Sequence, residues 1–306
     1  MSLLSIHNPT HRAIWGQCLG DSIASHLPNL DPLNTWVELQ RQRKLPYKRG
    51  QLSIYTKQMI GLVNLRLRSP SSSALEFKQL AHSFFRKNSA QTLLCRAIKE
   101  DQPYSNADLE LAVRLGPLAT CFSDGFEMLD SIYALTKLFS IHPHSIVGTL
   151  IYTSQAWNLS QESPIENADL FHFMRNWSTK TDIPSETWWV FEQAIRILEQ
   201  EYPLQEMLDF VNNISGQPKD TPPSPRQSLS ILPLLFQDTE TELDWSHILQ
   251  FKGDIEILMN LKGCLLGLQH EIPTWLASSL SHIKSLQAYP IQQVEPREKQ
   301  LRLFDL

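Results

Sequence analysis

Apolar residues recur every three or four positions along most of the chain, which is the spacing of helices with one buried face. The clearest ladder consists of Met128, Leu129, Ile132, Leu135 and Phe139. The same spacing is found in residues 11–24, 52–67, 145–159, 185–199, 204–214 and 254–268. No segment shows the strict alternation of a half-buried strand. The pattern predicts an all-α domain of roughly a dozen helices, with those of residues 122–139, 145–159 and 254–268 at its centre.

The amino-acid composition supports helices over the glycine-rich nucleotide-binding folds. Glycine accounts for 11 of 306 residues, which is about half its usual share in proteins. Rossmann and P-loop folds need glycine in their phosphate-binding turns, so this composition disfavours them. The sequence also contains no Walker motif, no Gly-x-Ser-x-Gly and no His-Glu-x-x-His. It therefore lacks the common signatures of nucleotide-, serine- and zinc-dependent hydrolases.

The charge balance limits the classes of partner. The chain carries 27 Lys and Arg against 32 Asp and Glu, a formal net charge of −5, which excludes a globally basic nucleic-acid binder. Residues 41–50 concentrate basic side chains, and for this run we favour a solvated loop face over a contact with phosphate or nucleic acid. We therefore predict no direct binding of nucleic acid.

The cysteines and the N-terminus indicate the compartment. Cys18, Cys95, Cys121 and Cys264 lie far apart and form no Cys-x-x-Cys pair. This disfavours a zinc ribbon or a disulfide scaffold and suggests isolated thiols in a reducing compartment. The N-terminus lacks the pattern of a signal peptide, and no apolar stretch approaches the length of a membrane span. We expect a cytoplasmic protein that makes no membrane contact.

A change in composition divides the chain into a long helical part and a short tail. We predict that residues 1–289 form a single helical domain, within which the proline-rich segment 216–227 is a loop. Residues 290–306 are polar and become abruptly apolar at their end, so they are predicted to form a tail with a terminal apolar peptide.

Three stretches in order resemble the ADP-ribosylglycohydrolase family. They are AIWGQCLGDS at 13–22, AVRLGPLATCFSD with LTKLFSIHPHSIVGTLIYTSQAW at 112–124 and 135–157, and KGDIEILMNLKGCLLGLQHEIPTW at 252–275. The resemblance implies a single orthogonal all-α domain and a hydrolase that holds two Mg²⁺ ions around ADP-ribose. Independently of it, Gly263 and Gly267 are four residues apart, a spacing that permits close packing of two helices.

The early metal motif of the family, Thr-Asp-Asp, corresponds to Ile54, Tyr55 and Thr56 in this chain. Both carboxylates are therefore missing. Mg²⁺ requires an octahedron of hard oxygen ligands, usually carboxylates and waters, which an aliphatic side chain and a phenol cannot supply. The family's Gly-Asn-Gly before Arg114 is also replaced, by Asp-Leu-Glu at residues 108–110. A backbone that must approach a ligand closely would lose its room there.

The late metal motif keeps two acids, Asp254 and Glu256, while Ile257 stands where the family has Thr. Two acids carry too little negative charge to bind two divalent ions. One alternative is that Asp254 and Glu256 hold a single cation weakly. The other alternative is that Asp254 caps the helix that follows it. We expect no cofactor, and Mg²⁺ only if hydrolase activity has been kept.

These losses favour a catalytically degenerate protein that serves as a binding or scaffolding module for a protein partner. The alternative is an active hydrolase of ADP-ribosylated protein, or of a related ribosyl compound, with an altered metal site. Candidate residues of a residual pocket are Asp21, Tyr55, Thr56, Arg114 and His142. The hydrolase requires Asp21, Asp254 and Glu256 to converge in a cleft. It is disfavoured if Tyr55 fills that cleft.

Two histidines, His142 and His144, flank Pro143 at a predicted helix start. Side chains two positions apart at a helix start point in different directions. The spacing therefore predicts no metal site, and we expect each histidine to be exposed or internally hydrogen-bonded.

The last residues contain Gln-Leu-x-Leu-Phe, formed by Gln300, Leu301, Leu303 and Phe304. This pentapeptide resembles the motif by which bacterial replication and repair proteins bind the DNA sliding clamp. A short extended peptide of this kind inserts its apolar side chains into a pocket. The resemblance implies a clamp-associated accessory protein. The alternative is that these residues fold back onto the domain as a structural cap.

Overall fold

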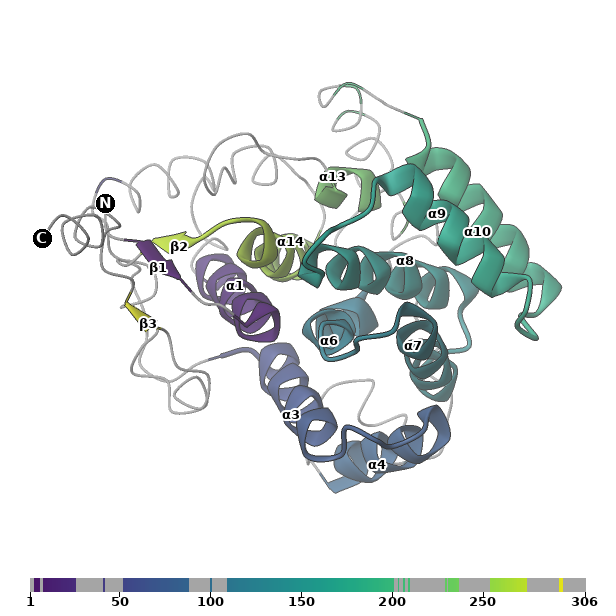
Figure 1. The fold of residues 1–306 in the computed structure, drawn as a ribbon, viewed down its shortest axis with the longest axis horizontal. Helices are drawn as coiled ribbons and strands as arrows, with labels where there is room; N and C mark the ends of the chain where they lie inside the picture. The colour runs from purple at the N-terminus through teal and green to yellow at the C-terminus, as the bar shows by residue number, and fades with distance from the viewer. Residues whose placement is uncertain are drawn as a thin grey trace, which may run out of the picture.

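A computed structural model describes residues 3–5, 8–25, 41, 52–87, 100, 109–200, 203, 206, 209, 229, 231–236, 254–273 and 292–293. Its helices are α1 (Pro9–Ala24), α3 (Ile54–Arg68), α4 (Ala74–Lys87), α6 (Glu110–Ala119), α7 (Gly125–Phe139), α8 (Pro143–Ser160), α9 (Asn167–Ser178), α10 (Ser185–Leu198), α13 (Leu232–Phe236) and α14 (Ile255–Gln269). The strands are β1 (Leu3–Ser5), β2 (Ile272–Pro273) and β3 (Gln292–Gln293). The described part of the chain is mostly helical, as predicted (Figure 1).

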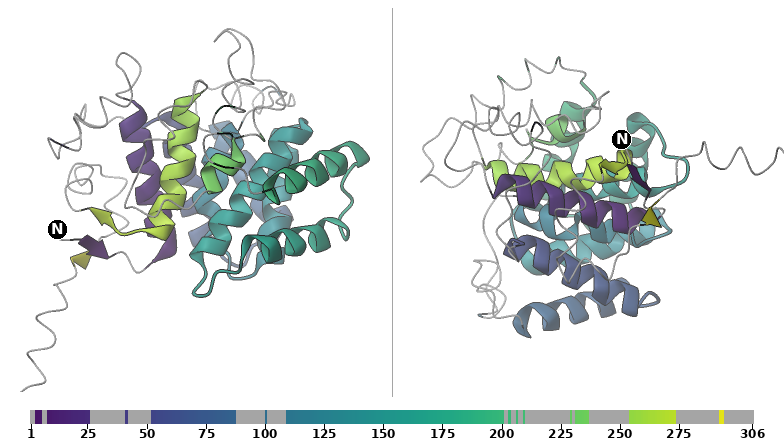
Figure 2. Two further views of the ribbon diagram at one scale, coloured as in Figure 1. Left: turned by 90° about the horizontal axis from the view of Figure 1, so that it is seen from above. Right: turned by 90° about the vertical axis from the view of Figure 1, so that its left-hand side faces the viewer.

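Helices α1 and α14 lie side by side and antiparallel, with their backbones in direct contact (Figure 2). A Cβ atom built on Gly16 of α1 would lie 2.1 Å from the carbonyl oxygen of Gly263. One built on Gly20 would lie 2.0 Å from the carbonyl oxygen of Met259. No side chain fits at these separations, so only glycine permits the approach. The predicted role of Gly263 and Gly267 in close helix packing is confirmed, because both face Gly16.

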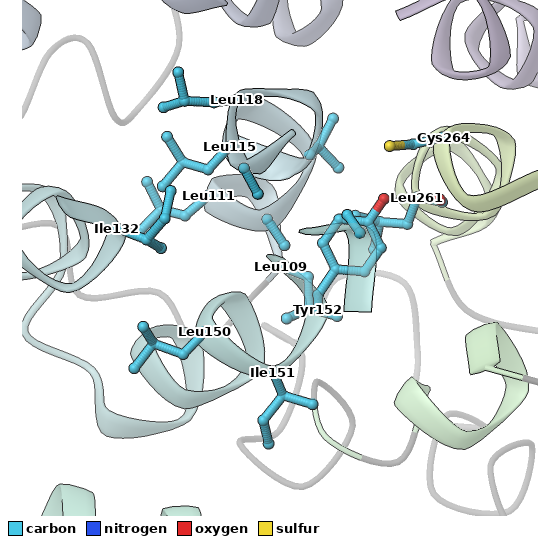
Figure 3. Close-up of a cluster of buried hydrophobic side chains, with 14 of the residues drawn as sticks. Leu109, Leu111, Leu115, Leu118, Ile132, Leu150, Ile151, Tyr152, Leu261 and Cys264 are labelled. Carbon is cyan, nitrogen blue, oxygen red and sulfur yellow. Dashed lines mark hydrogen bonds between the residues drawn. The ribbon is translucent and has the colours of Figure 1, made fainter. Parts of the chain in front are cut away.

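Helices α6 and α8 form the centre of the hydrophobic core (Figure 3). Leucines of both helices pack together with Ile132 of α7, and all of them are buried. Tyr152 of α8 points toward α14, where its hydroxyl donates a hydrogen bond of 2.8 Å to the carbonyl oxygen of Leu261. The bond satisfies the polar end of a fully buried aromatic ring. Of the three segments predicted to be central, residues 145–159 form α8 of this centre. Residues 122–139 and 254–268 form α7 and α14, which pack against α6 and α8, whereas α6 was not among the predicted segments.

Helices α3 and α4 lie on one side of this core, and α9 and α10 pair on another (Figure 1). Arg66 of α3 is buried, stacks on the ring of Phe122 and donates to the carboxylate of Glu127 on α7. It also donates to the carbonyl oxygen of Ser72, so it ties the α3–α4 turn to α7. None of the described helices combines the length and the apolar character needed to cross a bilayer.

The three strands form a small sheet that the hydrophobic pattern did not predict. β1 lies between β2 and β3 and is antiparallel to both; Leu4 pairs with Ile272 on one side and with Gln293 on the other. Strands of two or three residues are too short to show an alternating pattern, which is why they were missed. Because β3 lies within residues 290–306, the predicted tail begins with a strand bound to the N-terminal segment.

Candidate functional site

Polar side chains gather where the C-terminal half of α1 meets the N-terminal ends of α3, α6 and α14. Asp21 of α1 is buried, and its Oδ2 accepts a hydrogen bond of 2.8 Å from the backbone N–H of Ser53, the residue that caps α3. The amide of Asn260 approaches Oδ1 at 3.5 Å. Burial raises the pKa of Asp21, and its contacts with Ser53, Thr56 and Asn260 offset part of the rise.

Thr56 and Asn260 extend this network into the core. Both side chains are fully buried, and the Thr56 hydroxyl donates to the amide oxygen of Asn260 at 3.2 Å. The Asn260 amide in turn donates to the backbone carbonyl of Glu256 at 2.9 Å. Thr56 therefore takes part in a neutral hydrogen-bond network and supplies no charge to the site.

Tyr55 and Arg114 occupy the adjoining space together. The guanidinium of Arg114 lies 4.6 Å from the centre of the Tyr55 ring, a cation–π contact. The Tyr55 hydroxyl donates to one carboxylate oxygen of Glu110 at 3.0 Å, and Nη1 of Arg114 donates to the other at 3.1 Å. Burial and the Glu110 charge raise the pKa of Tyr55, so its hydroxyl keeps the proton that it donates.

Arg114 is held on a second side by α3. Its Nε donates to the side-chain oxygen of Gln58 at 2.7 Å, and its Nη1 also reaches the backbone carbonyl of Glu110 at 2.8 Å. The side chain is fully buried, whereas its Nη2 has no hydrogen-bond partner among the described residues. The guanidinium is thus held by three protein acceptors, which are the side-chain oxygen of Gln58 and the backbone carbonyl and carboxylate of Glu110.

Asp254 and Glu256 lie at the start of α14, and both side chains are exposed. Oδ1 of Asp254 accepts from the backbone N–H of Ile257 at 3.1 Å, so Asp254 caps α14, in agreement with the second sequence alternative. The surrounding protein excludes part of the water near Glu256 and raises its pKa. The charges of Asp21, Asp254 and Glu110 raise it further, which indicates that the four carboxylates face a common region. Within the described ranges, no three His, Cys, Asp or Glu side chains are arranged to hold a metal ion.

Repulsion within this acidic group gives a first prediction. We expect Glu256→Gln to raise the melting temperature at pH 7, because the substitution removes a partly desolvated charge that also lies among like charges. A carboxyl whose folded pKa is raised destabilises the fold above that pKa, and the penalty disappears as the pH falls toward its ordinary value of 4.5. The gain should therefore shrink between pH 7 and pH 4.5 when melting is followed by circular dichroism.

The exposed Glu162, outside the cluster, provides the matched control. Glu162→Gln removes the same charge and should leave the pH profile of melting unchanged. An equal profile for both variants would contradict the electrostatic coupling.

His142 lies apart from this group. It occupies the N-cap position of α8 without a capping hydrogen bond from its side chain, and its backbone N–H donates to the Ser140 hydroxyl at 3.0 Å. Its ring lies beside that of His144. The prediction that the two histidines point apart is wrong, since their ring centres are 5.4 Å from each other. The charge of Glu186 on α10 acts on both rings.

Sequence reasoning missed Gln58, Glu110 and Asn260 as site residues. A signal for Glu110 was present, because it precedes Arg114 by one helical turn, the spacing of an ion pair. Gln58 and Asn260 are polar residues within apolar helical ladders, which is a weaker signal for a buried network. The remaining candidates, Gln300, Leu301, Leu303 and Phe304, lie outside the described residues.

No protein-family model matches the chain, and no curated protein matches it significantly.

Proposed function

We propose that this protein is a non-catalytic binding or scaffolding module whose all-α fold is similar to that of the ADP-ribosylglycohydrolases. One observation carries the proposal: a cation of the protein itself, the Arg114 guanidinium, is buried among the residues that the resemblance implies for the metal site. It pairs with Glu110 and is covered by Tyr55. A carboxylate that is neutralised by an internal guanidinium does not need a metal ion.

The other carboxylates support the same conclusion. Two-metal catalysis requires carboxylates whose charge is left for the ions. Asp21 accepts a hydrogen bond from Ser53, and Asp254 accepts one from Ile257. Of the four acids, Glu256 alone makes no side-chain hydrogen bond within the described part of the chain. One carboxylate without a fixed partner is too little to hold two Mg²⁺ ions.

A protein partner is the most suitable target for such a module. Trp189 of α10 is 61 % exposed, and Ile141 before α8 is 60 % exposed. Large apolar side chains, tryptophan above all, supply much of the binding energy at protein interfaces. The fold therefore offers large apolar side chains on its surface as contact points for a protein partner.

The second candidate function, an active hydrolase with an altered metal site, is favoured by the mutual influence of Asp21, Glu110, Asp254 and Glu256. We expect the purified protein to show no Mg²⁺-dependent release of ADP-ribose from ADP-ribosyl-arginine or ADP-ribosyl-serine. The assay should give the same background with Asp254→Ala, which removes the cap of α14 and costs about 1 kcal/mol of stability. Turnover that requires Mg²⁺ and is lost in Asp254→Ala would establish the hydrolase instead. Calorimetry with ADP-ribose, with and without Mg²⁺, separates retention of the nucleotide from retention of the metal.

Clamp binding through the C-terminal peptide is a third proposal, compatible with the first. Six residues separate β3, which is tied to β1, from Gln300, so the peptide is tethered to the domain by a short polar linker. We expect a peptide of the last ten residues to bind a bacterial sliding clamp with micromolar affinity at best. Burial of two or three apolar side chains gains roughly 1.5–3 kcal/mol each, and part of this is lost to ordering of the peptide.

The measurement is a titration of the peptide onto the clamp, monitored by fluorescence anisotropy. The control peptide carries Leu303→Ala and Phe304→Ala. Equal binding by the two peptides would leave the terminal residues without a role in clamp recognition.

A further inference from the structure

The segment from His142 to His144 presents two imidazoles on a rigid frame, away from the acidic group. His142 is the N-cap of α8, and its carbonyl accepts the first helical bond, from Ile146 at 3.1 Å. Pro143 fixes the backbone at the first helical position. The Ser140 hydroxyl accepts from the His142 N–H at 3.0 Å. Neither histidine can therefore move far without unwinding the helix start.

The two rings have the separation that a shared metal ion requires. Their centres are 5.4 Å apart and their planes are inclined by 56°. Zinc binds an imidazole nitrogen at about 2.0–2.1 Å, so two rings on one tetrahedral ion have centres roughly 5 Å apart. The observed pair is within a few tenths of an ångström of that value, so the ring separation is compatible with one shared ion.

The electrostatic setting also favours a cation. Nδ1 of each ring has no hydrogen-bond partner among the described residues, although it is shielded from solvent. Burial lowers the pKa of both His142 and His144, which favours the neutral imidazole that binds a metal. The exposed carboxylate of Glu186, in the first turn of α10, acts on both rings.

We propose that His142 and His144 bind a divalent ion of the zinc type, with Glu186 as the third protein ligand. Two histidines and a glutamate form a common zinc ligand set that leaves the fourth position open. As the side chains stand, the described part of the chain has no complete three-ligand cluster, so Glu186 turns toward the histidines when the ion binds. The site would bridge α8 and α10 and is independent of the proposed function.

The test is a titration of the full-length, metal-free protein with ZnCl₂ in a calorimeter at neutral pH. We expect one ion per chain. His144→Gln, which leaves the α8 cap intact, should weaken binding at least about tenfold, since even outer ligands of a metal are worth that much. Glu186→Gln should weaken it less. Cobalt(II) should give the visible absorption bands of a tetrahedral site in the wild-type protein and lose them in His144→Gln.

His172→Gln, at an exposed histidine of α9, is the matched control and should bind zinc like the wild type. Far-ultraviolet circular dichroism of each variant verifies that it is folded. Absence of zinc uptake by the wild type would overturn the proposal. So would equal affinity of the wild type and His144→Gln, which would place the ion on other groups such as the cysteines.

Discussion

Gly16→Ala is expected to destabilise the protein by about 3 kcal/mol or more, the upper end of the usual cost of overpacking. The added Cβ would lie 2.1 Å from the carbonyl oxygen of Gly263 and 2.8 Å from Cα of Gly267. Both obstacles are backbone atoms of α14, so no rotamer change can relieve the clash, and the two helices must separate. The midpoint of urea unfolding, followed by circular dichroism, measures the loss.

Gly148→Ala is the matched control, because it makes the same chemical change in another buried helix. Its Cβ would lie 2.6 Å from Cδ2 of Leu109, the flexible end of a side chain that can turn aside. We expect a clearly smaller shift of the unfolding midpoint. A loss as large as that of Gly16→Ala would mean that crowding in general, rather than backbone contact between α1 and α14, sets the cost.

The double substitution Tyr55→Asp with Thr56→Asp should produce the second large effect, a protein whose stability depends on Mg²⁺. Residue 56 is fully buried next to Asp21. A second carboxylate there adds an uncompensated buried charge, which costs roughly 3–5 kcal/mol. Loss of the Tyr55 ring also uncovers the Arg114 guanidinium. If the two positions restore the ligands implied by the family resemblance, Mg²⁺ should raise the melting temperature of the variant and leave that of the wild type unchanged.

The neutral double variant Tyr55→Asn with Thr56→Asn is the control, since it has a similar shape and lacks the charge. It should melt at a temperature that Mg²⁺ does not alter. If the Tyr55→Asp, Thr56→Asp protein is folded and Mg²⁺ does not change its melting temperature, the resemblance has assigned the metal ligands to the wrong residues.

The helical fold was predictable because its long helices carry a strong periodic signal. The ladder from Met128 to Phe139 became one buried face of α7, as expected. Helices α1, α8 and α14 are buried on nearly all sides, so their sequences mark them as helices but not which neighbour each side contacts. The glycine pair of α14 indicated close packing, yet the partner helix became known only from the structure.

Only some residues of the candidate site were predictable from the sequence, and fewer of their contacts. The family resemblance named Tyr55, Thr56 and Arg114 as candidates, and the four-residue spacing of Glu110 and Arg114 on α6 was a signal of their ion pair. The contact of Arg114 with Gln58 depends on how α6 packs against α3, which the sequence does not show. The ring contact of His142 and His144 was missed because local backbone angles at a helix cap, not sequence spacing, decide where the two side chains point.

The pairing of α1 with α14 joins elements from opposite ends of the described chain, and this governs how the protein can fold during synthesis. Helix α1 is synthesised long before α14, so its glycine-containing face has no α14 to pack against until that helix has been made. Contacts this distant in sequence close slowly because the loop between them must first be ordered. Any premature termination before α14 therefore releases a chain whose first helix has lost its main partner, and such a fragment exposes apolar surface to aggregation and proteolysis.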